Sequence, residues 1–379
     1  MAERVALARC ESYHLPVLEN CLKKLLGLLG GIGEFVKNGD RVLIKINLLS
    51  GKPPEKAVTT HPNLVEAVVN LVKEAGGIPA IGDSPGGRAT LTGLARAYRT
   101  AGFEEVSRKT GVPLVSFEDD VIEVGNSRGR LYKKFKVTKQ IKDFDVIISV
   151  PKLKTHPLTY ITAGVKNNFG FIPGLRKTEF HLKLPDSELF SQMLIDLLDT
   201  VKIDLVILDA IVSMEGNGPA GGTPRKVGAI LVSKNPVALD FVACKLIGYK
   251  NALDIPTNRI AVERKMFLPG NIEISGEKIE DLQVKDFKRI PRDVSRNIPQ
   301  FLLKWLKNLL SPKPKIIEKL CNRCLYCLES CPVKCVGKTK NGKPSIDYSD
   351  CIRCFCCQEL CSQGAIITKS PWWVKLFTA

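Results

Sequence analysis

The sequence lacks the long apolar segment that a membrane-spanning helix needs. No apolar run approaches the ~20 residues required to cross a bilayer, although 44% of the 379 residues are hydrophobic. The first residues, MAERVALARCESYH, lack the basic start, apolar middle and small-residue cleavage site of a secretion signal. These absences predict a cytoplasmic globular protein, and the length favours one large domain with a smaller one.

Signatures of nucleotide and nucleic-acid binding are also missing. The sequence has neither a Walker loop nor a G-x-G-x-x-G segment directly after a predicted strand, so familiar ATP, nicotinamide and flavin sites get no support. The formal net charge is +17, which indicates an anionic substrate, an acidic partner or a membrane surface. Because no nucleic-acid motif or row of stacking aromatic residues accompanies the charge, we expect no nucleic-acid partner.

Cysteine is concentrated near the C-terminal end. Ten of the thirteen cysteines lie between Cys321 and Cys361, and without an export signal we expect them to bind metal rather than form disulfides. They include two groups with the spacing C-x2-C-x2-C-x3-C, in which three thiolates surround one 4Fe–4S cube and the fourth reaches the other cube. The predicted ligands are Cys321, Cys324, Cys327 and Cys361 for cluster 1, and Cys351, Cys354, Cys357 and Cys331 for cluster 2.

Both groups resemble those of the two-cluster bacterial ferredoxins. Pro332 follows the first group, whereas Ser362 takes the place of the usual proline after the second. Cys335 and Cys356 are surplus to the eight ligands, and we expect them to be small, partly buried residues. A pair of zinc sites is the alternative, since C-x2-C pairs also build those. Two clusters in one small fold indicate electron transfer and imply a redox partner protein as donor or acceptor.

Residues 1–285 predict an α/β domain. Short apolar, β-rich runs alternate with amphipathic segments, which is typical of a mostly parallel sheet with helices on both faces. Thr60, just before Pro62, is the predicted cap of the first of these helices. We expect strands at 41–46, 78–82, 145–150, 205–209 and 227–233, and helices at 63–75, 91–101, 186–201 and 236–248.

Polar side chains follow four of the predicted strands, at the edge where open α/β sheets bind ligands. The predicted catalytic residues are His156, Lys154 and Asp83, which would steer protons and stabilise negative charge. Glycines in GVKNNFG and GNGPAGG would let backbone N–H groups approach an anion. The residues expected to bind an anionic small molecule are Lys45, Asn47, His61, Lys152, Lys166, Asn167, Lys177, His181, Asp209 and Glu215.

Histidine is scarce, and three of the four histidines fall inside these motifs. His61, His156 and His181 could together ligate a metal, or one of them could act as a general acid. Ordinary hydrogen bonding is the remaining interpretation for each of them. The sequence leaves these alternatives open.

Several of these segments together resemble a known family. The segments KINLL, TTHPNLVEAVV, GDSPGG, VPKLKTH, GVKNNFG, GNGPAGG and SKNPVALDFVACKLIG are similar, over about residues 40–250, to the family catalogued as domain of unknown function 362. Many of its members carry a C-terminal double-cluster ferredoxin. The resemblance implies that the lysine, histidine and glycine motifs line one site, and it implies no particular activity.

A basic linker, residues 286–319, is predicted between the α/β domain and the ferredoxin domain at 320–370. Within it, residues 298–310 (IPQFLLKWLKNLL) form an amphipathic pattern, and an aromatic tail follows at 371–379. We favour docking of the two domains by these apolar faces. The alternative is a peripheral membrane contact.

The sequence therefore predicts an iron–sulfur protein in which two 4Fe–4S clusters pass electrons to an anionic substrate or cofactor held by the α/β domain. Such a protein would be a ferredoxin-linked reductase. The alternative is a non-catalytic electron-transfer or binding subunit that serves a separate redox enzyme, with the basic surface facing that partner.

Overall fold

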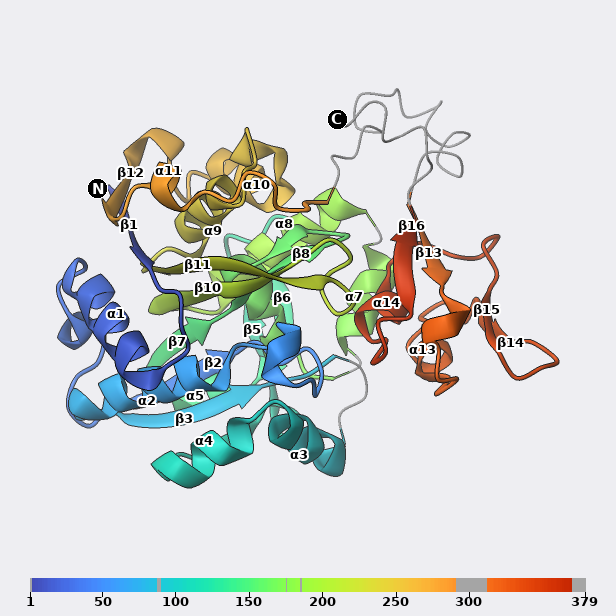
Figure 1. The fold of residues 1–379 in the computed structure, drawn as a ribbon, viewed down its shortest axis with the longest axis horizontal. Helices are drawn as coiled ribbons and strands as arrows, with labels where there is room; N and C mark the ends of the chain where they lie inside the picture. The colour runs from blue at the N-terminus through green and yellow to red at the C-terminus, as the bar shows by residue number, and fades with distance from the viewer. Residues whose placement is uncertain (1, 87–89, 175, 185, 291–311, 370–379) are drawn as a thin grey trace.

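A computed structural model describes residues 2–86, 90–174, 176–184, 186–290 and 312–369. A large α/β domain carries a small cysteine-rich region at one side (Figure 1). The predicted linker helix at 298–310 and the tail at 371–379 lie outside the described residues. Within the described ranges, no helix is both long enough and apolar enough to span a bilayer.

The large domain is built on a ten-stranded sheet in the order β12-β1-β11-β10-β7-β2-β3-β4, with β8 beside β10 and β9 beside β8. Strands β10, β7, β2, β3 and β4 are parallel, whereas β11 is antiparallel to both of its neighbours. The sheet is therefore mixed and mostly parallel, as predicted. Its strands are β1 (Glu3–Arg9), β2 (Arg41–Ile46), β3 (Ile78–Asp83), β4 (Leu114–Ser116), β7 (Val146–Val150), β8 (Lys152–His156), β9 (Tyr160–Thr162), β10 (Leu205–Glu215), β11 (Thr223–Ser233) and β12 (Ile272–Gly276).

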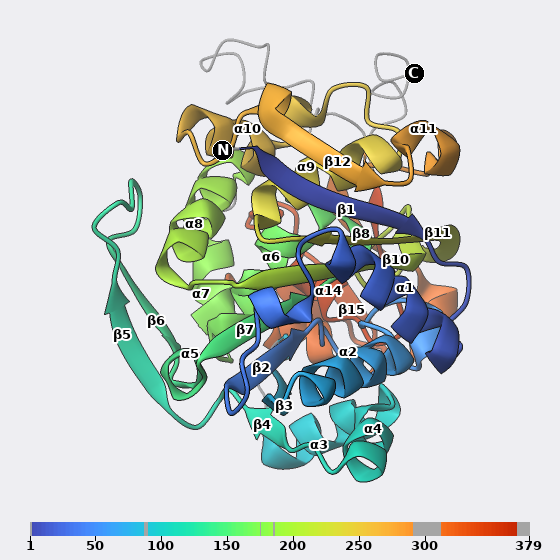
Figure 2. The ribbon, with the colours of Figure 1, turned by 90° about the vertical axis from the view of Figure 1, so that its left-hand side faces the viewer.

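Helices cover both faces of the sheet, as the continuous apolar strands require (Figure 2). Side chains alternate along each strand, so Val5 and Leu7 of β1 join one core while Ala6 and Ala8 join the other. One core packs α1 (Leu15–Gly27), α2 (Pro62–Glu74), α3 (Leu91–Thr100) and α4 (Phe103–Thr110), and the other packs α6 (Gly164–Asn167), α8 (Ser187–Thr200), α9 (Pro236–Leu246) and α10 (Pro256–Glu263). Further elements are the hairpin β5 (Val121–Gly125) and β6 (Lys134–Thr138), with α5 (Gln140–Asp143), α7 (Arg176–Lys183) and α11 (Ile279–Leu282).

One predicted helix cap is wrong. His61, not Thr60, caps α2, because its Nδ1 accepts a hydrogen bond of 3.2 Å from the backbone N–H of Asn63. The Thr60 hydroxyl instead accepts from Asn47 N at 2.9 Å and donates to Val150 O at 2.6 Å. Thr60 therefore ties the end of β2 to the end of β7.

The cysteine-rich region contains two short antiparallel sheets and two helical turns. It comprises β13 (Lys313–Ile316) paired with β16 (Ile366–Lys369), β14 (Val336–Lys338) paired with β15 (Pro344–Ile346), α13 (Tyr326–Glu329) and α14 (Cys356–Glu359). The α14 segment faces the large domain (Figure 1). Its buried Gln358 side chain donates to Asn217 Oδ1 at 2.7 Å and to Gly218 O at 3.1 Å. The side chain of Asn217 also accepts from Thr368 N at 2.9 Å, so this one loop residue contacts both α14 and β16.

Candidate functional site

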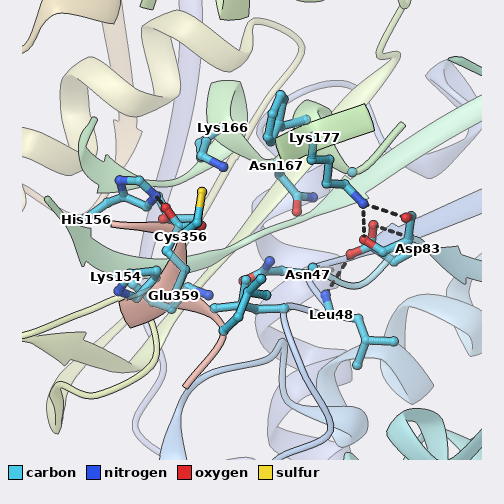
Figure 3. A pocket seen from close by; sticks show the side chains of 18 of the residues that line it. Asn47, Leu48, Asp83, Lys154, His156, Lys166, Asn167, Lys177, Cys356 and Glu359 are labelled. Carbon is cyan, nitrogen blue, oxygen red and sulfur yellow. Dashed lines mark hydrogen bonds and ion pairs between the residues drawn. The ribbon is translucent and has the colours of Figure 1, made fainter. Parts of the chain in front are cut away.

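A pocket with about 650 Å³ of empty space lies where the carboxyl ends of β2 and β3 meet β8 and the cysteine-rich region (Figure 3). Its position is the edge at which open α/β sheets bind ligands. The large domain contributes Lys45, Asn47, Asp83, Ser84, Lys154, His156, Thr162, Lys166, Asn167, Gly170, Lys177 and His181, and the cysteine-rich region contributes Cys356, Glu359 and Leu360. The pocket is therefore shared between the two parts of the chain.

At one end of the pocket, protein oxygens accept hydrogen bonds from the ammonium groups of two lysines. The ammonium of Lys45 lies 2.7 Å from Asp83 Oδ1 and also donates to Ile46 O and Asn167 Oδ1. Lys177 donates to Ser84 O at 2.8 Å and to Pro85 O at 3.0 Å, as well as to the Ser84 hydroxyl. With three acceptors each, these two ammonium groups are occupied.

Gly170 packs closely against the ion pair of Lys45 and Asp83. A Cβ atom at this position would lie 2.2 Å from Asp83 Oδ1 and 2.4 Å from Lys45 Nζ. Any larger residue would therefore collide with the ion pair. The second glycine of GVKNNFG is needed for close packing against these side chains.

At the other end of the pocket lie two lysines whose ammonium groups have N–H donors that no described residue accepts. Lys154 is fully buried and donates to Val58 O at 2.7 Å. Lys166 lies with its ammonium 4.4 Å from the centre of the Phe169 ring and has no hydrogen bond to any residue in the described part of the chain. Burial, together with the nearby Lys166, lowers the pKa of Lys154 to about 7. An anion placed here would meet unused N–H groups and would favour the charged lysines.

His156 and Glu359 face each other across the boundary between the two parts of the chain. Nδ1 of His156 accepts the backbone N–H groups of Leu158 and Thr159 at 3.1 and 3.2 Å. The proton of the neutral ring therefore resides on Nε2, which lies 2.8 Å from Glu359 Oε1 (Figure 3). The N–H is not well aligned with that oxygen. This arrangement suits His156 as a hydrogen-bond donor better than as a general acid or base.

Burial alone would raise the pKa of Glu359, but the neighbouring N–H of His156 and the charge of Lys166 lower it, so the carboxylate is ionised. His181 is neutral because burial lowers its pKa to about 4. Its ring stacks on Phe190 with centroids 4.7 Å apart.

Buried polar atoms around the pocket lack a well-formed hydrogen bond within the described ranges of the chain. They are Asn47 Oδ1, Thr162 Oγ1, His181 Nδ1, His156 Nε2 and Glu359 Oε1. Buried polar groups are normally hydrogen-bonded, so a cluster of unmet ones points to a ligand or bound water. The pocket therefore suits a polar ligand.

Four residues predicted for the site lie outside the pocket. Lys152 forms a buried ion pair of 2.9 Å with Asp209, which also accepts from Tyr13 OH and His61 N at 2.7 and 3.0 Å. The His61 ring stacks on Tyr13 with centroids 3.6 Å apart. Glu215 accepts the backbone N–H of Lys288 at 3.0 Å. These side chains tie elements of the fold together, and His61 is not grouped with His156 and His181.

The two glycine motifs do not present backbone N–H groups to an anion as expected. In GVKNNFG, buried Asp240 accepts the N–H groups of Gly164 and Val165 at 2.6 and 3.0 Å. In GNGPAGG, Asn217 and Gly218 hold Gln358. Because β10 continues to Glu215, the G-x-G-x-x-G spacing at 216–221 does follow a strand. It leads into strand β11, however, and not into the helix that a dinucleotide site requires.

The cysteines surround two further cavities. One cavity, of about 290 Å³, is lined by Cys331, Cys351, Cys354 and Cys357, together with surplus Cys335. The other, of about 350 Å³, is lined by Cys321, Cys324, Cys327 and Cys361. Each set takes three cysteines from one motif and the fourth from the other motif. In the described residues, no three His, Cys, Asp or Glu side chains are grouped to hold a single metal ion.

The two cysteine loops have matching backbone conformations. Arg323 and Leu325 in the first loop have φ values of 58° and 60°, and Arg353 and Phe355 in the second have 59° and 61°. A left-handed conformation is costly for such side chains and persists where the surroundings require it. Here it curls each loop around its cavity, which is consistent with an iron–sulfur site.

Sequence reasoning missed two residues that complete the lysine pocket, Cys356 and Glu359. Both lie inside the second cysteine motif, where the spacing draws attention to the ligands and not to the residues between them. Cys356 is buried, as predicted for a surplus cysteine, but it lies at the pocket wall and not at either cysteine cavity. Its neighbour in the sequence, Cys357, lines the smaller cavity. The lysine pocket and a cysteine cavity are thus separated by one turn of α14.

The fold and the pocket define a mostly parallel α/β protein whose ligand pocket is completed by a cysteine-rich region. The chain belongs to the family described as Domain of unknown function (DUF362), whose profile matches residues 42–245. It is 35% identical over 323 residues to a thylakoid-associated protein of Synechocystis sp., covering 82% of this chain and 98% of that one.

Two solved structures are similar to part of the chain. A Thermotoga maritima protein is 13% identical with a TM-score of 0.37, over 55% of this chain and 52% of its own. The lactate racemase apoprotein of Thermoanaerobacterium thermosaccharolyticum is 12% identical with a TM-score of 0.37, over 62% of this chain and 54% of its own. The chain thus spans about half the length of these two structures.

Proposed function

We propose that this protein is an iron–sulfur electron-transfer protein that binds two 4Fe–4S clusters and reduces an anionic small molecule in the lysine pocket. The observation that carries the proposal is the position of α14. This helix forms a wall of the lysine pocket through Cys356 and Glu359. It also contains one proposed cluster ligand, Cys357, and a second, Cys361, follows it two residues later.

The cysteine cavities fit the proposed clusters. Each is lined by the four predicted ligands, with three from one C-x2-C-x2-C loop and one from the other motif, as two-cluster ferredoxins require, and Cys335 also lines the smaller cavity. Cluster 1 would be held by Cys321, Cys324, Cys327 and Cys361, and cluster 2 by Cys351, Cys354, Cys357 and Cys331. When bound, the clusters would supply one-electron transfer at a potential that the ligands and their surroundings set.

Lys154 and Lys166 are the residues best suited to bind the anion. Both have donors that the protein leaves unused, whereas the donors of Lys45 and Lys177 are occupied. In a buried site their charges would also stabilise negative charge that develops during reduction. The N–H of His156 would add a neutral donor beside them. We assign Asp83 a positioning role through its ion pair with Lys45.

A separate redox protein would exchange electrons with the cysteine-rich region on the side of Cys324. All thirteen cysteines lie within the described ranges, and Cys324 is the exposed one. A cluster edge near the surface favours transfer to a docked partner. In the alternative proposal the chain is a non-catalytic subunit, and the lysine pocket binds a metabolite without reducing it.

The test is reoxidation of the reduced protein by candidate anions under strictly anaerobic conditions, with the reaction monitored by visible absorbance. A reductase would be reoxidised by its substrate at a rate that falls by at least about a hundredfold in Lys154→Met, the loss typical of a buried charge-stabilising group. Iron and sulfide analysis comes first, with about eight irons per chain expected. Ligand binding without reoxidation would favour the non-catalytic subunit, and zinc in place of iron would refute the proposal.

We also propose a cytoplasmic location with peripheral contact to a membrane surface. The support is the printed description of the Synechocystis relative as thylakoid-associated, together with the net charge of +17. Flotation of the full chain with vesicles containing about 30% anionic lipid would test it, because association should fall as salt rises. No co-flotation at low salt would refute the membrane contact.

A further inference from the structure

Glu359 presents a carboxylate to the end of the pocket where the anion-binding lysines lie. It extends from α14 toward His156, and Lys154 and Lys166 both interact with it electrostatically (Figure 3). Its Oε1 atom is buried and lacks a well-aligned hydrogen bond. An anion bound by the two lysines would therefore lie close to a second negative charge.

The pocket offers acceptors as well as donors. Asn47 Oδ1 and Glu359 Oε1 can only accept hydrogen bonds, and the Thr162 hydroxyl can do either. A bare anion has no hydrogen to give to these atoms, so it would leave them unmet and would be repelled by Glu359. A ligand with an N–H or O–H beside its charge would satisfy the carboxylate with a strong, charge-assisted hydrogen bond.

Glu359 is also held firmly enough to select a ligand. The preceding residue, Gln358, is buried and is fixed by Asn217 and Gly218, and its Oε1 accepts from Thr368 Oγ1 at 2.9 Å. A Cβ atom on Gly86 would lie 2.4 Å from the Leu360 side chain, so the loop after β3 packs directly against α14. The backbone that carries Glu359 therefore cannot move away from the pocket without breaking these contacts.

We propose that the pocket selects an anion that carries a hydroxyl or amino group next to its charged group, with Glu359 as the residue that recognises this second group. Lys154 and Lys166 bind the anionic group, and Glu359 accepts a hydrogen bond from the hydroxyl or amine. The inference rests on the anion site of the proposed function and adds the class of its ligand. It gives the cysteine-rich region a role in specificity.

Three small probes test the proposal: acetate, glycolate with a hydroxyl, and glycine with an amine. Their binding to the anaerobically purified full chain is measured by equilibrium dialysis with radiolabelled compounds. A site built to pair with a hydroxyl or amine discriminates strongly against an analogue that lacks it. We expect glycolate and glycine to bind at least about tenfold more tightly than acetate, a factor that corresponds to about 1.4 kcal/mol.

The matched variants are Glu359→Gln and Glu329→Gln. Glu329 occupies the same place in the first cysteine motif, two residues after its third cysteine, but it is exposed and does not line the pocket. In Glu359→Gln the preference over acetate should fall to within about twofold, because the neutral amide no longer makes a charge-assisted hydrogen bond with the hydroxyl or amine. In Glu329→Gln it should be unchanged.

The outcomes separate this inference from the function on which it rests. Equal binding of acetate and glycolate, lost in Lys154→Met, would overturn the selection by Glu359 and leave the anion site intact. A preference that survives Glu359→Gln would likewise overturn the role of Glu359. Binding of all three probes that is absent, or unaffected by Lys154→Met, would overturn both.

Discussion

Lys152 and Lys154 lie two residues apart on β8, and both are completely buried, yet they should respond in opposite ways to removal of their charge. Lys152 is paired with Asp209 at 2.9 Å. Lys152→Met would leave that carboxylate buried without its cation, which typically costs about 3–5 kcal/mol. The Tyr13 hydroxyl and the His61 N–H would still donate hydrogen bonds to Asp209. We therefore expect the loss of stability to be nearer to about 3 than to about 5 kcal/mol.

Lys154 has no such partner. Its pKa of about 7, against an ordinary value of 10.5, means that burial opposes its charge, by up to roughly 5 kcal/mol at pH 7. Lys154→Met removes that opposition and loses one hydrogen bond to Val58 O, worth about 1 kcal/mol. We therefore expect the free energy of unfolding to stay the same or rise, while anion binding is lost.

The assay is anaerobic urea denaturation of both variants at equal iron content, monitored by circular dichroism. Anion binding is measured on the same preparations. Retained stability with lost binding in Lys154→Met, and the reverse in Lys152→Met, would match the structure. If Lys154→Met unfolds as readily as Lys152→Met, then Lys154 is a structural residue and the site is misassigned.

Three further predictions concern pH, the cysteines and the contact between the two parts of the chain. Lys154 and Lys177 both have pKa values of about 7 because they are buried, so between about pH 7 and pH 10 the unfolded chain binds more protons than the folded one. Stability should therefore rise with pH in that window, by about 1.4 kcal/mol per pH unit for each of these lysines, and Lys154→Met should lower this pH slope, measured from denaturation curves, by about that amount. Cys335→Ser should keep about eight irons per chain, whereas Cys324→Ser should lose about half of them by iron and sulfide assay; equal losses would show that the ligand assignment is wrong. Asn217→Ala should weaken the contact with Gln358 and Thr368 by about 1–3 kcal/mol. Hydrogen exchange should then speed up in residues 356–360 and not in β2, and uniform acceleration would contradict a local contact.

The main sheet was predictable because its signal is local. Strand β2 occupies the predicted residues, and α2, α3, α8 and α9 are found within two residues of the predicted ends. Apolar periodicity is a property of each segment alone, and burial on both faces leaves continuous apolar runs.

Strand β8 was not predictable in that way. Its sequence KLKTH is polar, so the residues read as a loop, yet all five are buried. The strand pairs with β9 and β10, and its last residue, His156, meets Glu359 of the cysteine-rich region. Buried lysines of this kind serve a pocket, and functional sites are where local patterns and tertiary structure disagree.

The candidate site was predictable only in part for the same reason. Residues that follow strands, such as Lys45 and Asp83, come together at the sheet edge that the topology dictates. Lys152 and Lys154 could not be separated by sequence, because the irregular register between β8 and β10 decides which of them meets Asp209. Glu359 could not be assigned to the pocket because its place depends on how the cysteine-rich region docks.

The most direct test of the whole account is an electron paramagnetic resonance titration of the reduced protein. We expect spectra of reduced 4Fe–4S clusters whose line shape changes when acetate, glycolate or phosphate is added, because α14 connects the lysine pocket to the cysteine cavities. The change should disappear in Lys154→Met and persist in Glu329→Gln. A chain without cluster signals, or spectra that the three anions leave unaltered, would contradict it.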